Sequence, residues 1–123
     1  MKDPLQDFLD DHLPLDGVAA CSVRFADRTY VTRCGDHFSA AQVEKVLGRL
    51  ALAADGLGYH GIHPTRLCWS FEHIRIHLAM RRDGTCLAVF LENRPGAGNG
   101  KLEGMLREFS NLPISGKAPG APA

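Results

Sequence analysis

The chain has 123 residues and a mass of 13.4 kDa, the size of one domain with a sizeable core. Its 14 basic and 14 acidic residues cancel to a formal net charge of zero, so it lacks the basic excess that is typical of nucleic-acid-binding proteins. The first residues are acidic, unlike a signal peptide, and no apolar run is long enough to span a bilayer. We therefore expect a cytoplasmic protein without membrane insertion.

The first part of the chain predicts a short helix followed by a hairpin of two strands. Pro4 suits the first turn of a helix, and apolar residues recur after it at helical spacing until Pro14 ends the pattern. Val18–Phe25 carries small or apolar residues on both alternating faces, which is typical of a strand covered on both sides. Thr29–Cys34 is rich in β-branched and aromatic residues, and it would pair with the first strand across a tight turn at Asp27.

A long helix over Ser39–Leu57 is the centre of the predicted domain. Ser39 and Gln42 form a capping box at its start. Its apolar residues form one broad arc that we expect to lie on the core: Val43, Val46, Leu47, Leu50, Ala54 and Leu57. Small and apolar residues also recur on the opposite side, flanked by two basic residues: Ala41, Gly48 and Leu52, with Lys45 and Arg49. This second strip indicates either a second packing partner or an ordinary solvated face.

The second half of the chain predicts three strands and a last helix. Arg66–Glu72 and Ile74–Arg82 alternate between apolar and polar residues, as strands with one buried face do. An aspartate-glycine turn, the strongest hairpin signal in the sequence, leads to Thr85–Glu92, which is apolar on both faces. After a glycine-rich stretch, apolar residues at helical spacing predict a helix over Lys101–Leu112.

These elements predict an α+β sandwich in residues 1–112, followed by a disordered tail at residues 113–123. The two strands that are apolar on both faces belong in the middle, so the five-stranded antiparallel sheet would have the strand order 2-1-5-4-3. One long helix would cover one face and the two shorter helices the other. The third strand would then be an open edge carrying Trp69 and Phe71, which is a hazard unless something pairs with it.

This order of elements resembles the Roadblock-type dynein light chain family of small Roadblock/longin-like domains. The resemblance spans Pro4–Leu112, and its local anchors are the long central helix and three short features: Gly17-Val18, the Asp27 turn and the Asp83-Gly84 hairpin. It implies a homodimer in which the central helices pack together and the sheets join edge to edge. The implied interface combines the second strip of the helix with the open edge: Ala41, Lys45, Gly48, Arg49, Leu52 and Trp69.

The resemblance also implies a function. We expect a non-enzymatic interaction module, without a cofactor, that binds or regulates a small Ras-like GTPase or scaffolds a multiprotein complex. The alternative is a ligand-sensing domain, similar to PAS or profilin-like folds, with a pocket between the sheet and a helix. One basic set on the third and fourth strands matches no family motif and is either a partner surface or a solvated strand face: Arg66, Arg75, His77 and Arg81.

Metal binding and catalysis have weaker support in the sequence. Several residues offer nitrogen and sulfur for a tetrahedral metal site, although their spacing matches no standard zinc pattern: His60, His63, Cys68 and His73. Cys34 lies near Asp36 and His37 at a strand end, the arrangement that comes nearest to an activated thiol. The glycine-rich residues 93–101 lack the spacing of a phosphate-binding loop, so we expect a connector there.

Overall fold

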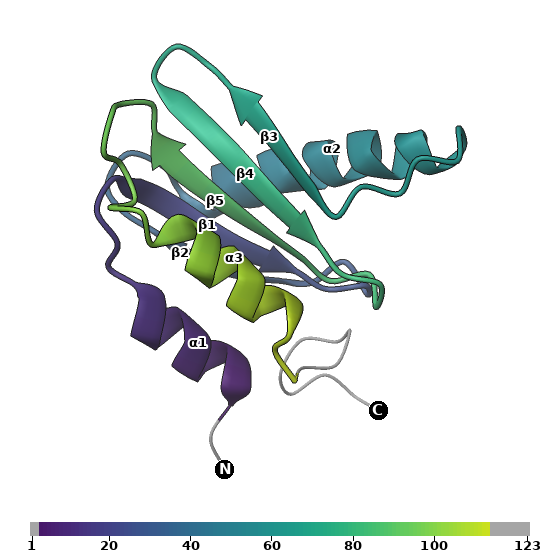
Figure 1. Ribbon diagram of the computed structural model, residues 1–123, viewed down its shortest axis with the longest axis horizontal. Coiled ribbons are helices and arrows are strands. Elements are labelled where there is room, and N and C mark those ends of the chain that lie inside the picture. The colour runs from purple at the N-terminus through teal and green to yellow at the C-terminus, as the bar shows by residue number, and fades with distance from the viewer. Residues whose placement is uncertain (1–2, 114–123) are drawn as a thin grey trace.

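A five-stranded antiparallel sheet with the predicted order β2-β1-β5-β4-β3 forms the middle layer of the computed structural model (Figure 1). The structure describes residues 3–113, so residues 114–123 of the predicted tail lie outside the described residues. The strands are β1 (Val18–Arg24), β2 (Tyr30–Cys34), β3 (Arg66–Ser70), β4 (Ile74–Met80) and β5 (Cys86–Glu92). The helices are α1 (Pro4–His12), α2 (Ala40–Gly58) and α3 (Leu102–Ser110). No helix within residues 3–113 is long and apolar enough to cross a bilayer.

The starts of α1 and α2 follow from local sequence. Asp3 Oδ1 accepts a hydrogen bond from the Leu5 amide at 3.0 Å, directly before Pro4 and the first turn. The capping box of α2 is formed as predicted: the Gln42 amide donates to Ser39 Oγ at 3.1 Å, and the Ser39 amide donates to Gln42 Oε1 at 2.9 Å. The start of each helix is therefore specified by residues that are close together in the sequence.

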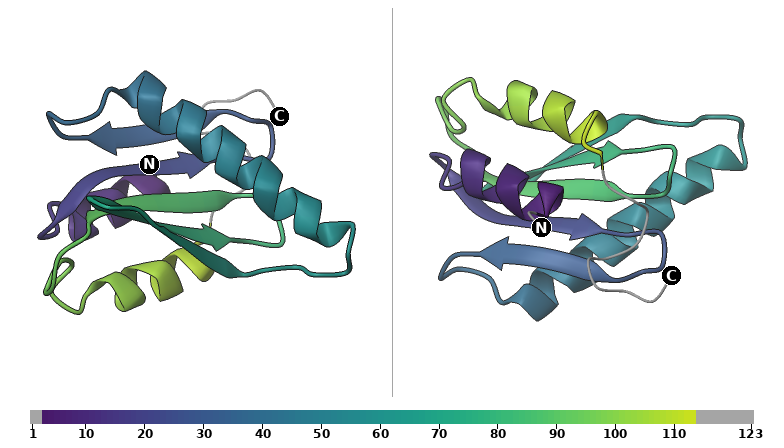
Figure 2. Two further views of the ribbon diagram at one scale, coloured as in Figure 1. Left: turned by 90° about the horizontal axis from the view of Figure 1, so that it is seen from above. Right: turned by 90° about the horizontal axis from the view of Figure 1, so that it is seen from below.

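The sheet separates two hydrophobic cores, because α2 covers one face and α1 and α3 cover the other (Figure 2). The side chains of α1 and α3 that fill one core are Leu5, Phe8, Leu9, Leu102, Met105, Leu106 and Phe109. Strand β1 contributes Cys21 and Val23 to this core and Ala20 to the core under α2. The central strands thus need apolar residues on both faces, which is why their sequences indicated a central place.

The connector of residues 93–101 packs on the turn before β1 and so places α3. The Gly98 amide donates to the Asp16 carbonyl at 2.6 Å, and Arg94 Nη2 pairs with Asp16 Oδ1 at 3.1 Å. Gly17 has a positive φ of 82°, and a Cβ atom there would approach Ala97 Cβ to 2.8 Å. A larger residue at Gly17 would therefore both strain the backbone and push the connector away.

Helix α2 is turned about its axis relative to the sequence prediction. Three residues of the predicted arc are fully buried: Val43, Leu47 and Ala54. The other three lie along one flank of the helix and are half-buried or exposed: Val46, Leu50 and Leu57. Ala51, which the sequence did not place on the core, is buried instead. The prediction of a six-residue core arc is therefore right for four residues, because Leu50 also packs against the core under α2, and wrong for Val46 and Leu57, which are not among its members.

Candidate interaction surface

The N-terminal half of α2 is fixed to the β2 side of the sheet. The Thr32 hydroxyl of β2 donates to Glu44 Oε2 at 2.7 Å. One turn further along, a Cβ atom at Gly48 would lie 3.0 Å from the Tyr30 hydroxyl of the same strand. Glu44 and Gly48 share one flank of the helix, so the opposite flank, which carries Val46 and Leu50, faces the β4 and β3 side of the sheet.

That opposite flank borders a part of the sheet that none of the three described helices covers. Figure 2 (left) shows α2 crossing the sheet diagonally, so that the end of β3 and the start of β4 stay clear of it. Side chains on this face of the two strands are only half-buried: Leu67, Trp69 and Ile74. Together with the flank of α2 they form what we call the open apolar surface: Val46, Leu50, Leu57, Leu67, Trp69 and Ile74.

The open apolar surface ends at β3, an edge strand with free backbone groups. The Phe71 amide donates to the Ile74 carbonyl at 2.8 Å, and the Met80 amide donates to the Thr65 carbonyl at 2.8 Å. In an antiparallel pair, alternate residues direct both backbone groups to the same neighbour, so the odd-numbered residues of β3 pair with β4. The even-numbered residues direct their backbone groups outward from the sheet: Arg66, Cys68 and Ser70.

The predicted strip on α2 lies elsewhere. Leu52 is 66% exposed on the side of the helix away from the sheet, and three other predicted residues are also exposed: Ala41, Lys45 and Arg49. Gly48 is not part of a free strip, because the Tyr30 hydroxyl of its own chain lies against it. Trp69 is half-buried within the open apolar surface. The predicted interface residues therefore do not form one continuous patch.

Two members of the predicted basic set have partners within the domain. Arg66 donates to both carboxylate oxygens of Glu103 at 2.7 and 2.6 Å, and this fork lowers the pKa of the Glu103 carboxyl. Arg81 donates to the carbonyl oxygens of Phe109 and Leu112 at 2.9 and 2.7 Å. Both arginines thus attach α3 to the sheet, which leaves only Arg75 and His77 as candidates for a partner surface.

His77 lies on β4, on the α3 side of the sheet. The Cys68 thiol is 3.8 Å from its Nε2 atom. Burial lowers the pKa of His77, and the charges of Arg75 and Arg66 lower it further, against a small opposite effect of Glu103. The folded state therefore binds this proton less tightly than the unfolded chain, whose histidine pKa is about 6.5.

The lowered pKa of His77 predicts a pH-dependent stability. As the pH falls through about 6.5, the unfolded state takes up a proton that folded His77 does not, so the free energy of unfolding decreases. Urea unfolding at about pH 7.5 and pH 5.5 measures this decrease, and His77→Gln should make it smaller. An equal decrease in the wild type and in His77→Gln would contradict the prediction. The lowered pKa of Glu103 acts in a separate window, below its usual value of 4.5.

The residues predicted for metal binding and for thiol chemistry are not assembled into sites. Within residues 3–113, no three histidine, cysteine or acidic side chains are placed to hold a metal ion. His73 lies beside Glu72 in the turn after β3, whereas His63 lies near Gly58 at the end of α2. Among the described residues 3–113, no hydrogen bond joins Cys34 to Asp36 or His37. The buried thiols are unreactive, since burial raises the pKa of Cys21 to about 12 and that of Cys86 to about 11.

Known structures share this arrangement of helices and strands. No protein-family model and no curated protein matches the sequence. Among solved structures, MglB from Myxococcus xanthus has a TM-score of 0.68 at 8% identity, covering 90% of this chain and 91% of that one. MglC from Myxococcus xanthus has a TM-score of 0.60 at 21% identity, covering 89% and 95%. A Roadblock/LC7 domain from Streptomyces avermitilis has a TM-score of 0.60 at 13% identity, covering 86% and 88%. With its sheet order and its helices on both faces, the chain therefore has a Roadblock/longin-like fold.

Proposed function

We propose that this chain is a homodimeric, non-enzymatic interaction module that binds or regulates a small Ras-like GTPase or scaffolds a multiprotein complex. The observation that carries the proposal is the continuity between the open apolar surface and the free edge of β3. The unpaired backbone groups of an edge strand can form hydrogen bonds with a strand of another chain. The half-buried apolar side chains beside it are more stable against a second protein surface than in water. The Roadblock/longin-like fold supplies the class of partner by analogy.

A second copy of the chain fits this surface. Antiparallel pairing of β3 with itself must place the outward-directed, even-numbered residues opposite one another, so the two-fold axis passes through Leu67, Cys68 or Trp69. Centring on Trp69 places Leu67 of one copy opposite Phe71 of the other on the α2 face. The same register places Arg66 opposite Glu72, so no like charges meet across the new pair of strands. We therefore propose this register, with the apolar flanks of the two α2 helices meeting over the joined sheets.

The chemistry of GTP hydrolysis would belong to the partner. The chain contains no G-x-x-x-x-G-K-S/T sequence, so it carries no P-loop of its own. A regulator of this kind acts by ordering the switch loops of the GTPase, and a dimer presents each of its surfaces twice. The rate of GTP hydrolysis by the partner, measured with and without this chain, distinguishes activation from assembly into a complex.

The solution mass tests the dimer. Light scattering across a concentration series is expected to give a stable mass near twice 13.4 kDa. In such a dimer, the second copy covers the apolar area at the α2 flank and β3 and so removes it from water. A mass of 13.4 kDa at every concentration would contradict self-association and with it the role assigned to the open apolar surface.

Capture in the presence of a slowly hydrolysed GTP analogue tests the partner class. The tagged chain is expected to retain, from its own cells, a protein with a P-loop, and more of it with the GTP analogue than with GDP. Mixing the two purified proteins then shows whether the hydrolysis rate rises or stays constant, which separates an activator from a scaffold. Partners without a P-loop in both nucleotide states would contradict a GTPase as the partner.

A further inference from the structure

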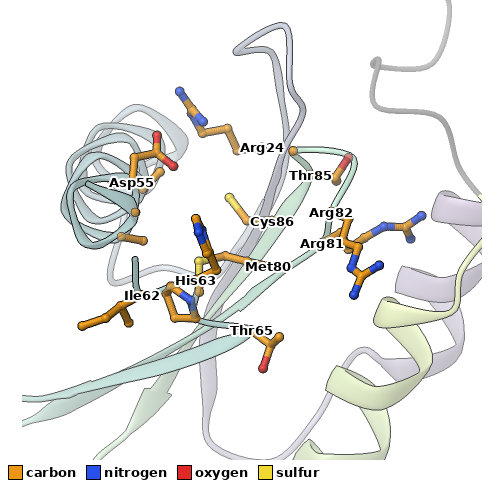
Figure 3. A pocket seen from close by; sticks show the side chains of 15 residues that line it. Arg24, Asp55, Ile62, His63, Thr65, Met80, Arg81, Arg82, Thr85 and Cys86 are labelled. Atoms are coloured by element: carbon orange, nitrogen blue, oxygen red, sulfur yellow. The ribbon is translucent and has the colours of Figure 1, made fainter. Parts of the chain in front are cut away.

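A cavity lies between the C-terminal half of α2 and the ends of strands β1, β4 and β5 (Figure 3). Its volume of ≈ 680 Å³ is in the range of small-molecule sites in proteins. Apolar side chains supply much of the lining: Ala51, Ala54, Ile62, Pro64, Met80 and Cys86. The cavity is on the flank of α2 that carries Asp55, opposite the flank of the open apolar surface, so both can be occupied at once.

Arg24 contributes the polar group that most needs a partner. It is the last residue of β1, opposite Cys86 of β5, and Figure 3 shows its side chain on the same side of the cavity as Asp55 of α2. Its Nε atom is buried and has no hydrogen-bond partner, and the Arg24 side chain contacts the Cys86 thiol, on whose pKa it has a lowering effect. A buried donor without an acceptor is unfavourable, because its bonds to water are lost on folding and not replaced. Because Arg24 lines the cavity, an acceptor group of a ligand beside its guanidinium would offset this loss.

The charges around the cavity favour an anion as that ligand. Arg24, Arg81 and Arg82 line it, against Asp55 as the one carboxylate among the lining residues. The Arg81 guanidinium points to the α3 side of the sheet (Figure 3), where it pairs with Asp83 at 3.0 Å and donates to carbonyl oxygens of the α3 end, so Arg24 and Arg82 supply the positive charge. Arginine holds carboxylate and phosphate groups well because its planar fork matches their oxygen atoms.

We propose that this cavity binds a small organic anion, in which a carboxylate or phosphate group is held by Arg24 and a short apolar body contacts Met80 and Ile62. The proposal is independent of the dimer, since it uses a different flank of α2 and the ends of other strands. It assigns a ligand class to a site between a helix and the sheet. A carboxylate and a phosphate both accept hydrogen bonds from a guanidinium, so the affinities of one ligand of each kind are compared by titration.

Three probes with the same chain length test the ligand class. Heptanoate, hexyl phosphate and 1-hexanol, which all carry a six-carbon alkyl chain, are titrated into the 15N-labelled protein, with the backbone amides of Ala54 and Cys86 as reporters. We expect both anions to shift these amides with saturation, at least about tenfold more tightly than 1-hexanol. The tighter of the two anions identifies the head group. Equal binding of 1-hexanol, or no saturable shift with either anion, would overturn the proposal.

Two substitutions of opposite sign test the role of charge. Arg24→Gln should weaken binding of the anions about tenfold and leave 1-hexanol unchanged, whereas Asp55→Asn should strengthen it. Arg107→Gln is the matched control, because Arg107 is an exposed residue of α3 on the other side of the sheet. It should leave the binding of the anions and of 1-hexanol unchanged. Thermal unfolding of each variant confirms that it is folded before the titration. Weaker anion binding in Asp55→Asn, or unchanged binding in Arg24→Gln, would show that the cavity does not select anions.

Discussion

Leu47→Glu is expected to unfold the domain. Leu47 is 0% exposed and lies in the middle of α2, within the core that the helix forms with β1, β5 and β4. The substitution removes a buried apolar side chain and places a carboxyl group where no charge within the core can pair with it. Together these effects reduce the free energy of unfolding by at least about 4 kcal/mol, most of the stability of a domain of this size. Circular dichroism with urea unfolding measures the loss.

The same substitution at Leu52 is the matched control. Leu52 is on the same helix but is 66% exposed, so Leu52→Glu should change the stability by no more than about 0.5 kcal/mol. Leu47→Met keeps the volume and the apolar character, and it should lose less than about 1.5 kcal/mol. If Leu47→Glu were as stable as Leu52→Glu, the orientation of α2 on the sheet would be wrong.

The sequence predicted the topology because local and global signals agree in this chain. Both central strands must be apolar on two faces, and the hairpins then leave a single sensible order for the others. The cap residues Asp3 and Ser39 and the turn at Gly84 act through backbone hydrogen bonds and positive φ, which depend on neighbouring residues alone. Such features can be predicted from the sequence with few assumptions.

The rotation of α2 could not be predicted in the same way. A helical arc that contains Val46, Leu50 and Leu57 is apolar whether the sheet of its own chain or another surface covers it. The deciding contacts come from β2, where Tyr30 and Thr32 hold the opposite flank of the helix. Periodicity shows which residues are apolar, but the position of the helix over the sheet decides which of them are buried by the chain itself.

Residues of the candidate sites were predicted less well, because they come from distant segments. The basic pattern on β3 and β4 gave no sign that Arg66 and Arg81 pair with α3, which lies about 30 residues further along the chain. The cavity likewise combines Arg24 with residues of α2 and the β4–β5 hairpin. No spacing rule joins such segments, although an arginine at the end of a central strand was a visible and unusual feature of the sequence.

Val46→Glu is expected to separate the dimer into folded monomers. Val46 is 36% exposed on the flank of α2 opposite Glu44 and Gly48, so the monomer can hydrate the new carboxylate. In a two-fold dimer the substitution occurs twice, and two like charges meet in an apolar interface. We expect the dissociation constant to rise at least about a hundredfold. Sedimentation or light scattering over a dilution series measures the change, with thermal unfolding as the check that the monomer is folded.

Leu52→Glu again provides the comparison, because it adds the same charge to the same helix on the side away from the sheet. If Val46→Glu is monomeric and Leu52→Glu dimeric, the interface is the open apolar surface. If Leu52→Glu alone is monomeric, the interface is the strip with Ala41 that the sequence indicated, and the uncovered part of the sheet has another partner. If both variants stay dimeric, α2 does not carry the association, and pairing through the free edge of β3 must hold the two copies together without the helices.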